Sequence, residues 1–554
     1  MKRFLNIITF LSAAMALWGA DLNPVANPEA VVTEGVVRIT VLTPEMIRVE
    51  YSPSKQFEDR ATFTVVNRNL PVPHFTKSED NEFLYINTDK LKLRYRKGTN
   101  PYFEPNPPAN LSITMELNGR PVTWFPGQGD GKNLKGTYRT LDRCFGDGYR
   151  SKLEDGLISR SGWAVIDDSP QCVRTDGSRS LALVPDETGV DWVAPRDDKQ
   201  SLDLYFLGYG HDYKRALHDY TLIAGKMPLP PDYAFGYWYS KYENYTADDY
   251  RNIIKDLKEN DINTDVLILD MDWHWNGDPD PNKSNGRGGW TGWSWNYNLI
   301  PDPTKLLKDI HDNGLHLALN LHPAMGVDAS EDIFRGMADD MGLDADTTKV
   351  IPWQLEDKSF YKAFANNFLR PFEKQGVDFW WLDWQQHLTS PYTDGLGETF
   401  WCNHVFYNDM KANRSDRRPI IFHRWGGLGS HRYQIGFSGD TFINYAALAF
   451  QPYFTATASN VCYGYWGHDI GGHMWDSNYP VNDPELLLRW FQFGVFTPIF
   501  RSHAAIGTWI NRKIWTYENF PQLNATVKLR YALFPYIYTC LLYTSPSPRD
   551  YAAS

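Results

Sequence analysis

The stretch SFYKAFANNFLRPFEKQGVDFWWLDW, residues 359–384, joins two different patterns. Residues 359–375 space their apolar side chains as one face of a helix does, whereas residues 377–384 form a short aromatic and apolar run that is typical of a buried strand. Gly376 separates them, as glycine often does at the end of a helix. The stretch therefore predicts a helix that leads into a buried strand ending at Asp383.

The same helix and strand unit recurs along the chain. DVLILDMDW (265–273) follows the helix-like residues 247–261, and LHLALNLHP (315–323) follows residues 304–314. Further strand candidates are a segment ending at Ser240, PIIFHRW (419–425), YQIGFSGD (433–440), VCYGYWGHD (461–469) and FGVFTPIFRSH (493–503). Strands that alternate with helices form a parallel sheet, and about eight of them favour a closed (β/α)8 TIM barrel over an open sheet. We expect this α/β barrel to span residues 231–540.

The chain before the barrel has a different texture. Between residues 21 and 207, short alternating or β-branched runs such as 36–51 and 202–208 are separated by Pro, Gly and Asn turns. Regularly spaced strands of this kind predict an all-β N-terminal sandwich. Residues 208–230 carry a helical segment and a Pro-rich joint, and we interpret them as the linker to the barrel.

Both ends of the chain stand apart from these domains. Residues 1–20 have a basic start, an apolar stretch too short for a comfortable membrane span, and small residues at the end, which predicts a cleavable secretory signal. A membrane anchor is the alternative. We therefore expect a secreted or periplasmic protein with no membrane span after signal cleavage. Residues 541–554 show no periodicity, so we interpret them as a non-native or disordered tail on a chain truncated near Cys540; a disordered natural terminus is the alternative.

Composition narrows the classes of partner. The chain has 67 acidic and 55 basic side chains, a formal net charge of −12 and no cluster of Lys and Arg, which argues against a nucleic-acid partner. Its five cysteines lie far apart without a CxxC pair, so they indicate neither a disulfide scaffold nor a zinc site. Aromatic residues make up 15% of the chain, and their flat rings suit sugar rings, although an aromatic-rich core explains the same figure.

Charged side chains follow nearly every strand of the predicted barrel. In such barrels the chemistry takes place at the C-terminal ends of the strands. These positions carry Asp270 and Asp272, His322, Asp383, Arg424, Asp440, Asp469 and His503. Taken singly, each residue could cap a helix or tie down a loop. Together they converge on one mouth of the barrel, which indicates a functional site.

Cofactor and metal sites find little support in the sequence. No Gly-rich phosphate loop precedes a helix, and GHDIGGH (467–473) lacks the spacing of a dinucleotide motif. Four residues could be metal ligands, namely His322, Asp383, Asp469 and His503. However, no HxH or HExxH pair is present, and Arg424 would oppose a cation. We therefore expect neither a cofactor nor a catalytic metal.

Two carboxylates in different surroundings suit the cleavage of a glycosidic bond. One must be ionised to attack or stabilise the anomeric carbon, and the other must be protonated to release the leaving oxygen. Asp383 ends a strand among aromatic residues, whereas Asp440 follows Gly439 in a turn that solvent can reach. We expect the two carboxyl groups about 5 to 5.5 Å apart, as in retaining enzymes, with the higher pKa on Asp440.

At these residues the sequence resembles glycoside hydrolase family 31, the retaining α-glycosidases that include α-glucosidases and α-xylosidases. The resemblance covers essentially the whole barrel and extends to GLISRSGWAVIDDS (156–169) in the sandwich. It implies that Asp383, in a Trp-x-Asp strand end, is the nucleophile. It also implies that Asp440, which comes 16 residues after the substrate-binding Arg424, is the acid/base.

The resemblance extends to the pocket around the sugar. It implies substrate-binding positions at Asp270, Trp381, Arg424, Asp469 and His503, and it also implicates His322 and Trp384. Many family members carry an Asp where this chain has His322, and Met-Asn-Glu where residues 384–386 are Trp-Gln-Gln. Because of these departures, the resemblance does not identify which sugar the protein binds. The family also implies C-terminal β-domains after the barrel, which this chain would lack.

The predicted function is that of an exo-acting retaining α-glycosidase, which cleaves α-linked sugars from non-reducing ends by double displacement. An α-transglycosylase or a glycan lyase would use the same carboxylates. A non-catalytic carbohydrate-binding homologue and an unrelated metallohydrolase on a barrel are further alternatives. We expect an oligosaccharide or a glycoside as the partner, while the sequence leaves the linkage and the oligomeric state open.

Overall fold

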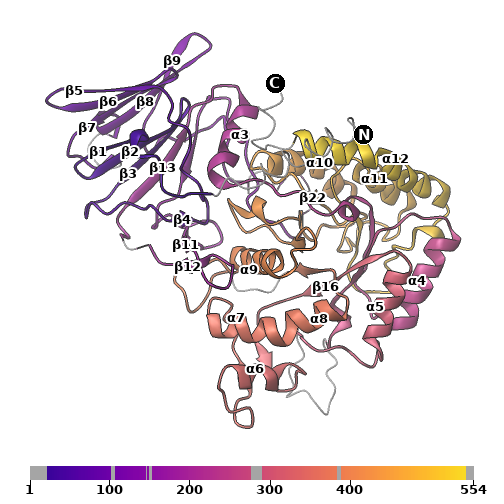
Figure 1. Cartoon of the computed structure of the whole chain (residues 1–554). Helices are drawn as coiled ribbons and strands as arrows, with labels where there is room; N and C mark the ends of the chain where they lie inside the picture. Colours follow the sequence, from indigo (N-terminus) through magenta and orange to yellow (C-terminus); the bar gives the residue numbers. More distant parts are fainter. Residues whose placement is uncertain are drawn as a thin grey trace, which may run out of the picture.

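The computed structural model describes residues 22–101, 107–144, 146, 148, 153–196, 198–275, 290–383 and 388–544. Figure 1 shows a β domain, drawn in indigo and purple, beside a larger domain of strands and helices. The predicted signal segment 1–20 lies outside the described residues, as do residues 545–554 of the predicted tail.

The N-terminal domain is built on two five-stranded antiparallel sheets. The first contains β1 (Val31–Glu34), β2 (Val37–Thr43), β3 (Met46–Tyr51), β13 (Leu202–Leu207) and β10 (Ala164–Asp167), in this order. The second contains β5 (Phe75–Glu79), β6 (Phe83–Thr88), β7 (Leu91–Arg96), β8 (Leu111–Leu117) and β9 (Arg120–Trp124). Alternate residues of β7 are buried, and Leu91, Leu93 and Tyr95 share one apolar cluster with Val37 and Ile39 of β2. The predicted sandwich is confirmed, because alternation buries one face of each sheet against the other.

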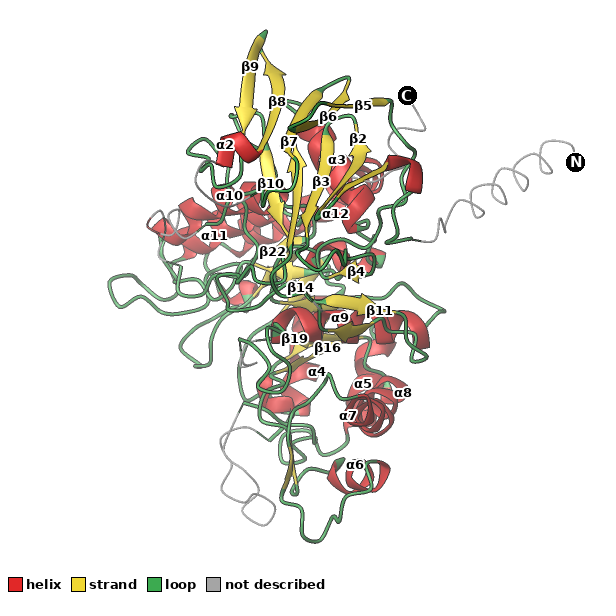
Figure 2. Cartoon of the chain, turned by 90° about the vertical axis from the view of Figure 1, so that its left-hand side faces the viewer, coloured by secondary structure: helices red, strands yellow, loops and turns green. Residues whose placement is uncertain are grey.

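A small third sheet lies between the sandwich and the barrel. It consists of β12 (Trp192–Ala194), β11 (Ala182–Val184) and β4 (Ala61–Thr62). Trp192 packs edge-on against Trp401 of helix α9 (Glu398–Asn413), with ring centroids 5.2 Å apart. Figure 2 shows β4 and β11 between the sandwich strands and the barrel strands. Buried aromatic side chains join the N-terminal domain to the barrel there.

The second domain is a parallel eight-stranded barrel. In chain order its strands are β14 (Tyr237–Tyr239), β15 (Val266–Leu269), β16 (His316–Leu321), β19 (Phe379–Leu382), β20 (Ile421–His423), β21 (Gly436–Phe437), β22 (Trp466–Gly467) and β23 (Phe500–Ser502). β23 pairs with β14, and a parallel bridge from Ile470 to Ser502 joins the last two strands. Every one of the predicted barrel strands is present, and the TIM barrel is confirmed.

Helices cover the outside of the barrel. They are α4 (Ala247–Glu259), α5 (Pro303–Asp312), α7 (Lys358–Phe364), α8 (Arg370–Gln375), α9, α10 (Tyr445–Ser459), α11 (Pro484–Gly494) and α12 (Phe520–Thr544). A π-helical turn, Ala365–Leu369, connects α7 to α8, so residues 358–375 run as one helical segment into Gly376 and β19. Gly376 has φ +128°, a conformation that side-chain-bearing residues rarely adopt, and it ends the helix sharply.

Shorter elements complete the chain. They are α2 (Pro107–Asn110), α3 (Tyr213–Ala224), α6 (Phe334–Asp340) and the hairpin of β17 (Val327–Asp328) with β18 (Val350–Ile351). Helix α3 lies within the predicted linker. Helix α12 continues to Thr544, four residues past the predicted end of the barrel at residue 540. Within the described ranges, no helix is both long enough and apolar enough to cross a membrane.

Candidate active site

Asp383 lies directly after β19, at the C-terminal mouth of the barrel. Arg424 Nε donates a hydrogen bond of 2.7 Å to its Oδ1, and Asn320 Nδ2 donates one of 3.1 Å to its Oδ2. Burial raises the pKa of this carboxyl, but the Arg424 charge, His322 and these two hydrogen bonds outweigh burial and hold the pKa well below its usual value. Asp383 is therefore ionised at neutral pH, as a nucleophile must be.

Arg424 connects Asp383 to the second predicted carboxylate. Its Nη2 donates to Asp440 Oδ1 at 3.0 Å, and its Nη1 donates to Asp142 Oδ1. One buried guanidinium thus contacts three carboxylates through three different nitrogens. The fixed geometry of this group places Asp383 and Asp440 beside each other. The side chain of Asp440 is 28% exposed against 12% for Asp383, so solvent reaches Asp440 more easily.

A segment of the N-terminal domain holds the loop of Asp440. Leu141 N donates to Ser438 O at 3.1 Å, and Arg143 N donates to Asp440 O at 2.8 Å. Between these two residues, Asp142 Oδ1 also accepts from the backbone N–H of Asp440 at 3.2 Å. The barrel mouth is therefore completed by a carboxylate from outside the barrel.

Asp270 and His503 face each other across the same mouth. Asp270 follows β15 and accepts a hydrogen bond of 2.7 Å from Met271 N, so it caps the 3₁₀ turn Met271–Trp273 as well as lining the site. Its Oδ2 lies 3.7 Å from His503 Nε2, while Ser240 Oγ bonds the other ring nitrogen of His503 at 2.7 Å. Burial, followed by the Arg501 charge, holds the pKa of His503 well below its usual value, so the ring is neutral.

Trp381 and Asp469 meet at Arg501. Arg501 lies over the Trp381 ring, 4.8 Å from the centroid, and its Nη2 binds Asp469 Oδ1. Trp381 also meets His503 edge-on at 5.2 Å. Burial raises the pKa of Asp469 to about 6, although Arg501 lowers it. Trp381 is almost fully buried, so it forms the backing of the site.

His322 follows β16 on the same side as Asn320, because residues two apart on a strand point to one face. Its Nε2 lies 3.6 Å from Asp383 Oδ2. Burial lowers the pKa of His322 to about 4, so the ring is neutral at neutral pH. Because the ionised Asp383 can only accept, a hydrogen bond between the two must be donated by the His322 ring. Trp384, the remaining predicted site residue, lies outside the described residues.

The structure adds three polar residues that the sequence did not single out. The sequence could have indicated Asn320, since it stands two residues before His322 in NLHP. His473 lies in the quoted GHDIGGH stretch, and its Nε2 comes within 3.8 Å of Asp440 Oδ2. The sequence could not have indicated Asp142 in this way, because it belongs to the other domain. Three ligand-type side chains, Asp469, His473 and His503, also lie close enough together to hold a metal ion.

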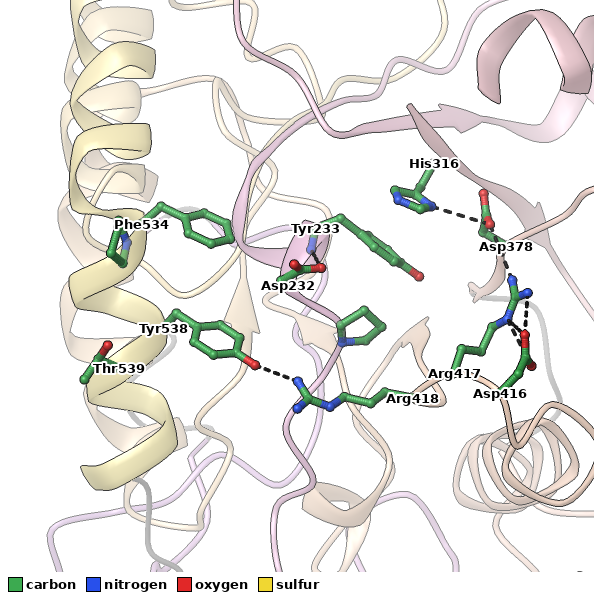
Figure 3. A pocket seen from close by; sticks show the side chains of 12 residues that line it. Asp232, Tyr233, His316, Asp378, Asp416, Arg417, Arg418, Phe534, Tyr538 and Thr539 are labelled. Carbon is green, nitrogen blue, oxygen red and sulfur yellow. Dashed lines mark hydrogen bonds and ion pairs between the residues drawn. The ribbon is translucent and has the colours of Figure 1, made fainter. Parts of the chain in front are cut away.

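A cavity of about 890 Å³ opens at the opposite end of the barrel (Figure 3). It is lined by residues at the N-terminal ends of strands, such as His316 at the start of β16 and Asp378 before β19, and by helix α12. Arg418 Nη1 donates to Tyr538 OH at 2.7 Å across it. None of the predicted site residues lines this cavity, and the N-terminal face of such barrels serves stability rather than chemistry.

Comparisons with known proteins give one family. The model of the TIM-barrel domain of glycosyl hydrolases family 31 matches residues 227–540. An alpha-xylosidase of Saccharolobus solfataricus is 27% identical over an alignment of 355 residues, which covers 60% of this chain and 46% of that protein. Alpha-glucosidase 2 of Bacillus thermoamyloliquefaciens is 27% identical over an alignment of 369 residues, which covers 60% of this chain and 44% of that protein. The chain thus spans about half the length of these curated relatives.

Solved structures show the same fold. The GH31 alpha-xylosidase from a soil metagenome, complexed with xylose, has a TM-score of 0.64 at 18% identity and covers 94% of this chain and 85% of its own. The GH31 dextranase of Flavobacterium johnsoniae, complexed with glucose, has a TM-score of 0.63 at 18% identity, with 91% and 66% coverage. At this identity the likeness concerns the fold alone.

Proposed function

Because the chain belongs to glycosyl hydrolase family 31, we propose that it is an exo-acting α-glycosidase that works with retention of configuration. The observation that carries this proposal is the pair of contacts from Arg424 to Asp383 and Asp440. Retaining glycosidases need two neighbouring carboxyl groups in different environments, one ionised and one able to hold a proton. A buried Asp383 held ionised, beside a more exposed Asp440, meets this need.

In this proposal Asp383 attacks the anomeric carbon of an α-linked sugar at a non-reducing end. Asp440 gives its proton to the leaving oxygen, so that a covalent glycosyl ester forms on Asp383 and the aglycone leaves as an alcohol. Asp440 then takes a proton from water, whose oxygen attacks the same carbon and releases Asp383. Asp270, Asp469 and His503 supply polar groups for the sugar hydroxyls, and Trp381 backs the pocket.

The names of the relatives indicate a class of substrates rather than one particular sugar. The matched proteins are named alpha-xylosidase and alpha-glucosidase, so we propose an α-linked xylose or glucose residue as the first candidates. The test is a screen of aryl α-glycosides, including the xyloside, the glucoside and the galactoside. Turnover of at least one of them supports the proposal. Binding of these sugars without turnover would favour a non-catalytic carbohydrate-binding protein.

Substitution of each carboxylate separates their roles. Asp383→Ala removes the nucleophile and should lower kcat on every aryl glycoside by a factor on the order of 10⁴ or more. Asp440→Ala removes the acid that protonates the leaving oxygen and the base that later activates water, worth about 10² to 10⁴. Its loss in kcat/KM, which reports the first step, should shrink as the leaving group becomes more acidic. Asp416→Asn, which changes an exposed carboxylate at the opposite end of the barrel, is the matched control. Equal losses for both variants on all leaving groups would contradict the assignment.

Transfer to a second sugar is the alternative that the same site supports. A transglycosylase would pass the sugar from Asp383 to an acceptor hydroxyl instead of water. Product analysis with an added acceptor distinguishes the two: mainly free sugar supports hydrolysis, and mainly a new disaccharide supports transfer.

A further inference from the structure

Asp469, His473 and His503 form a cluster beside the proposed acid/base. Each offers one ligand atom, and these atoms lie within 4.8 Å of one another. We propose that this cluster is a binding site for a zinc-like transition-metal ion, and that the bound ion inhibits the enzyme. Such an ion is not a cofactor of the reaction, for which the sequence predicts no metal.

Among the described residues, two buried polar atoms of the cluster have no hydrogen-bond partner. They are Asp469 Oδ2 and His473 Nδ1, which face each other at 3.5 Å. Asp469 is fully buried. A buried carboxylate oxygen without a partner is costly, on the order of 1–3 kcal/mol or more for a charged group. A cation between these two atoms would satisfy both at once.

Two of the three ligands, His503 and Asp469, are already oriented through their other polar atom. Ser240 Oγ bonds His503 Nδ1 at 2.7 Å, which leaves Nε2 to face the site. Arg501 binds Asp469 Oδ1, so that Oδ2 faces His473 Nδ1 at 3.5 Å. Outer contacts of this kind, to the atom opposite the ligating one, are what fixes the ligands of protein metal sites.

A double-glycine turn delivers His473 to the cluster. Gly471 and Gly472 have φ of +103° and +81°. A Cβ on Gly471 would lie 2.6 Å from Arg512 Nε, and one on Gly472 would lie 2.8 Å from Ile443 Cα, so both positions require glycine. Arg512 then holds the turn by donating to the carbonyls of both glycines, at 2.9 and 2.8 Å.

The ligand set selects the class of ion. Two imidazoles and one carboxylate suit Zn²⁺, Co²⁺ or Ni²⁺, whereas Mg²⁺ and Ca²⁺ prefer oxygen ligands. With Zn–N and Zn–O bonds of about 2.0–2.2 Å, the ligand atoms of a tetrahedral site lie about 3.4 Å apart. The 3.5 Å between Asp469 Oδ2 and His473 Nδ1 already fits this spacing, whereas the widest separation in the cluster, within 4.8 Å, must close by up to about 1.4 Å.

The charges around the cluster are mixed. Asp270 Oδ2 lies 3.7 Å from His503 Nε2, and Asp440 Oδ2 lies 3.8 Å from His473 Nε2. Both carboxylates favour a cation, while Arg501, which binds Asp469, opposes it. The positive charges of Lys241, Arg424 and Arg512 also reach the cluster. The positive and negative charges around the cluster thus offset each other, so the affinity for the ion depends on the three ligand side chains.

Inhibition follows from the position of the cluster, and this part of the inference rests on the proposed function. Asp469 and His503 are proposed sugar contacts, and His473 adjoins the proposed proton donor Asp440. An ion held by these side chains would occupy the space of the sugar hydroxyls. Binding of the ion, in contrast, does not depend on what the enzyme cleaves.

The test is a calorimetric titration of the chelator-treated full chain with ZnCl₂, alongside Co²⁺ absorption in the visible range. We expect one ion per chain and a tetrahedral Co²⁺ spectrum. His473→Phe keeps a ring to stack on His503, whose centroid is 5.1 Å away, but removes a ligand. It should weaken zinc binding at least 10-fold and remove the Co²⁺ bands. His473→Gln provides a second variant if the first does not fold.

His311→Ala is the matched control, since His311 contacts Asp378 at 2.9 Å at the other end of the barrel. It should bind zinc as the wild type does. Zinc should also inhibit turnover of the wild type reversibly, with activity restored by EDTA, and inhibit His473→Phe at least 10-fold less. No binding to the wild type, or equal binding to His473→Phe, would overturn the site. Binding at the site without any glycosidase activity would leave the site standing and refute the inhibition together with the proposed function.

Discussion

Arg424 contacts both proposed catalytic carboxylates, and a third carboxylate from the sandwich domain shares it. It is buried, and removing one partner of a buried ion pair costs about 3–5 kcal/mol. Loss of activity in an Arg424 variant would therefore mix chemistry with folding. Asn320 offers a cleaner probe, because its uncharged amide donates a hydrogen bond to the Asp383 carboxylate.

Asn320→Ala should move the acidic limb of the kcat/KM profile to higher pH. The hydrogen bond from Asn320 favours the ionised form and lowers the pKa of Asp383. Without it the pKa rises, so a smaller fraction of Asp383 is ionised at a given acidic pH, and activity falls away earlier as the pH is lowered. The basic limb, which reports the proton donor, should stay in place. A shift of the basic limb alone would contradict the assignment of Asp383 as the ionised group.

At the scale of elements, the turn between α8 and β19 sets the direction of the strand that ends at Asp383. Gly376 has φ +128° there, and a Cβ would lie 3.2 Å from His311 Cε1. The helix and the strand on either side were predictable, because residues 359–375 and 377–382 have different periodicities. The positive φ is the physical reason for the glycine between them.

Gly376→Ala should lower the free energy of unfolding by about 1–2 kcal/mol, since alanine is strained at this φ. Gly129→Ala is the control, because Gly129 has no positive φ and no atom within 4 Å of an added Cβ. Denaturant unfolding of the two variants gives the comparison. Equal stabilities would contradict the role of this turn.

The sandwich was less fully predicted than the barrel. Strand β8, for example, was not among the strand candidates, although Leu111, Ile113 and Met115 alternate on its buried face. Conversely, residues 61–66 (ATFTVV) contain four β-branched residues among six, but only Ala61–Thr62 pairs as a strand. Short edge segments are decided by their partners rather than by their own composition, which is why these details escape the sequence.

At the scale of the whole molecule, the sandwich contributes to the site. The barrel residues of the site could be predicted, because the ends of parallel strands meet at one mouth wherever the strands are recognised. Asp142 could not, because it lies 282 residues before its partner Arg424 and no local pattern links the two. Only the packing of the two domains brings it to Asp440.

Asp142→Ala should lower kcat/KM by at least about 10-fold, a loss of about 1.4 kcal/mol of transition-state stabilisation. The substitution removes a hydrogen bond to Asp440 N and a charge on Arg424. Asp155→Asn, which only loses an exposed ion pair with Lys135, is the control in the same domain. An unchanged kcat/KM in Asp142→Ala would show that the barrel forms the site alone.

The central claim is that Asp383 and Asp440 cleave an α-glycoside with retention. It is tested most directly by following the first seconds of hydrolysis of an accepted aryl α-glycoside by proton NMR. Retention predicts that the α-anomer of the free sugar appears first and the β-anomer only later, through mutarotation. Initial release of the β-anomer would mean a single displacement by water, and would contradict a covalent intermediate on Asp383.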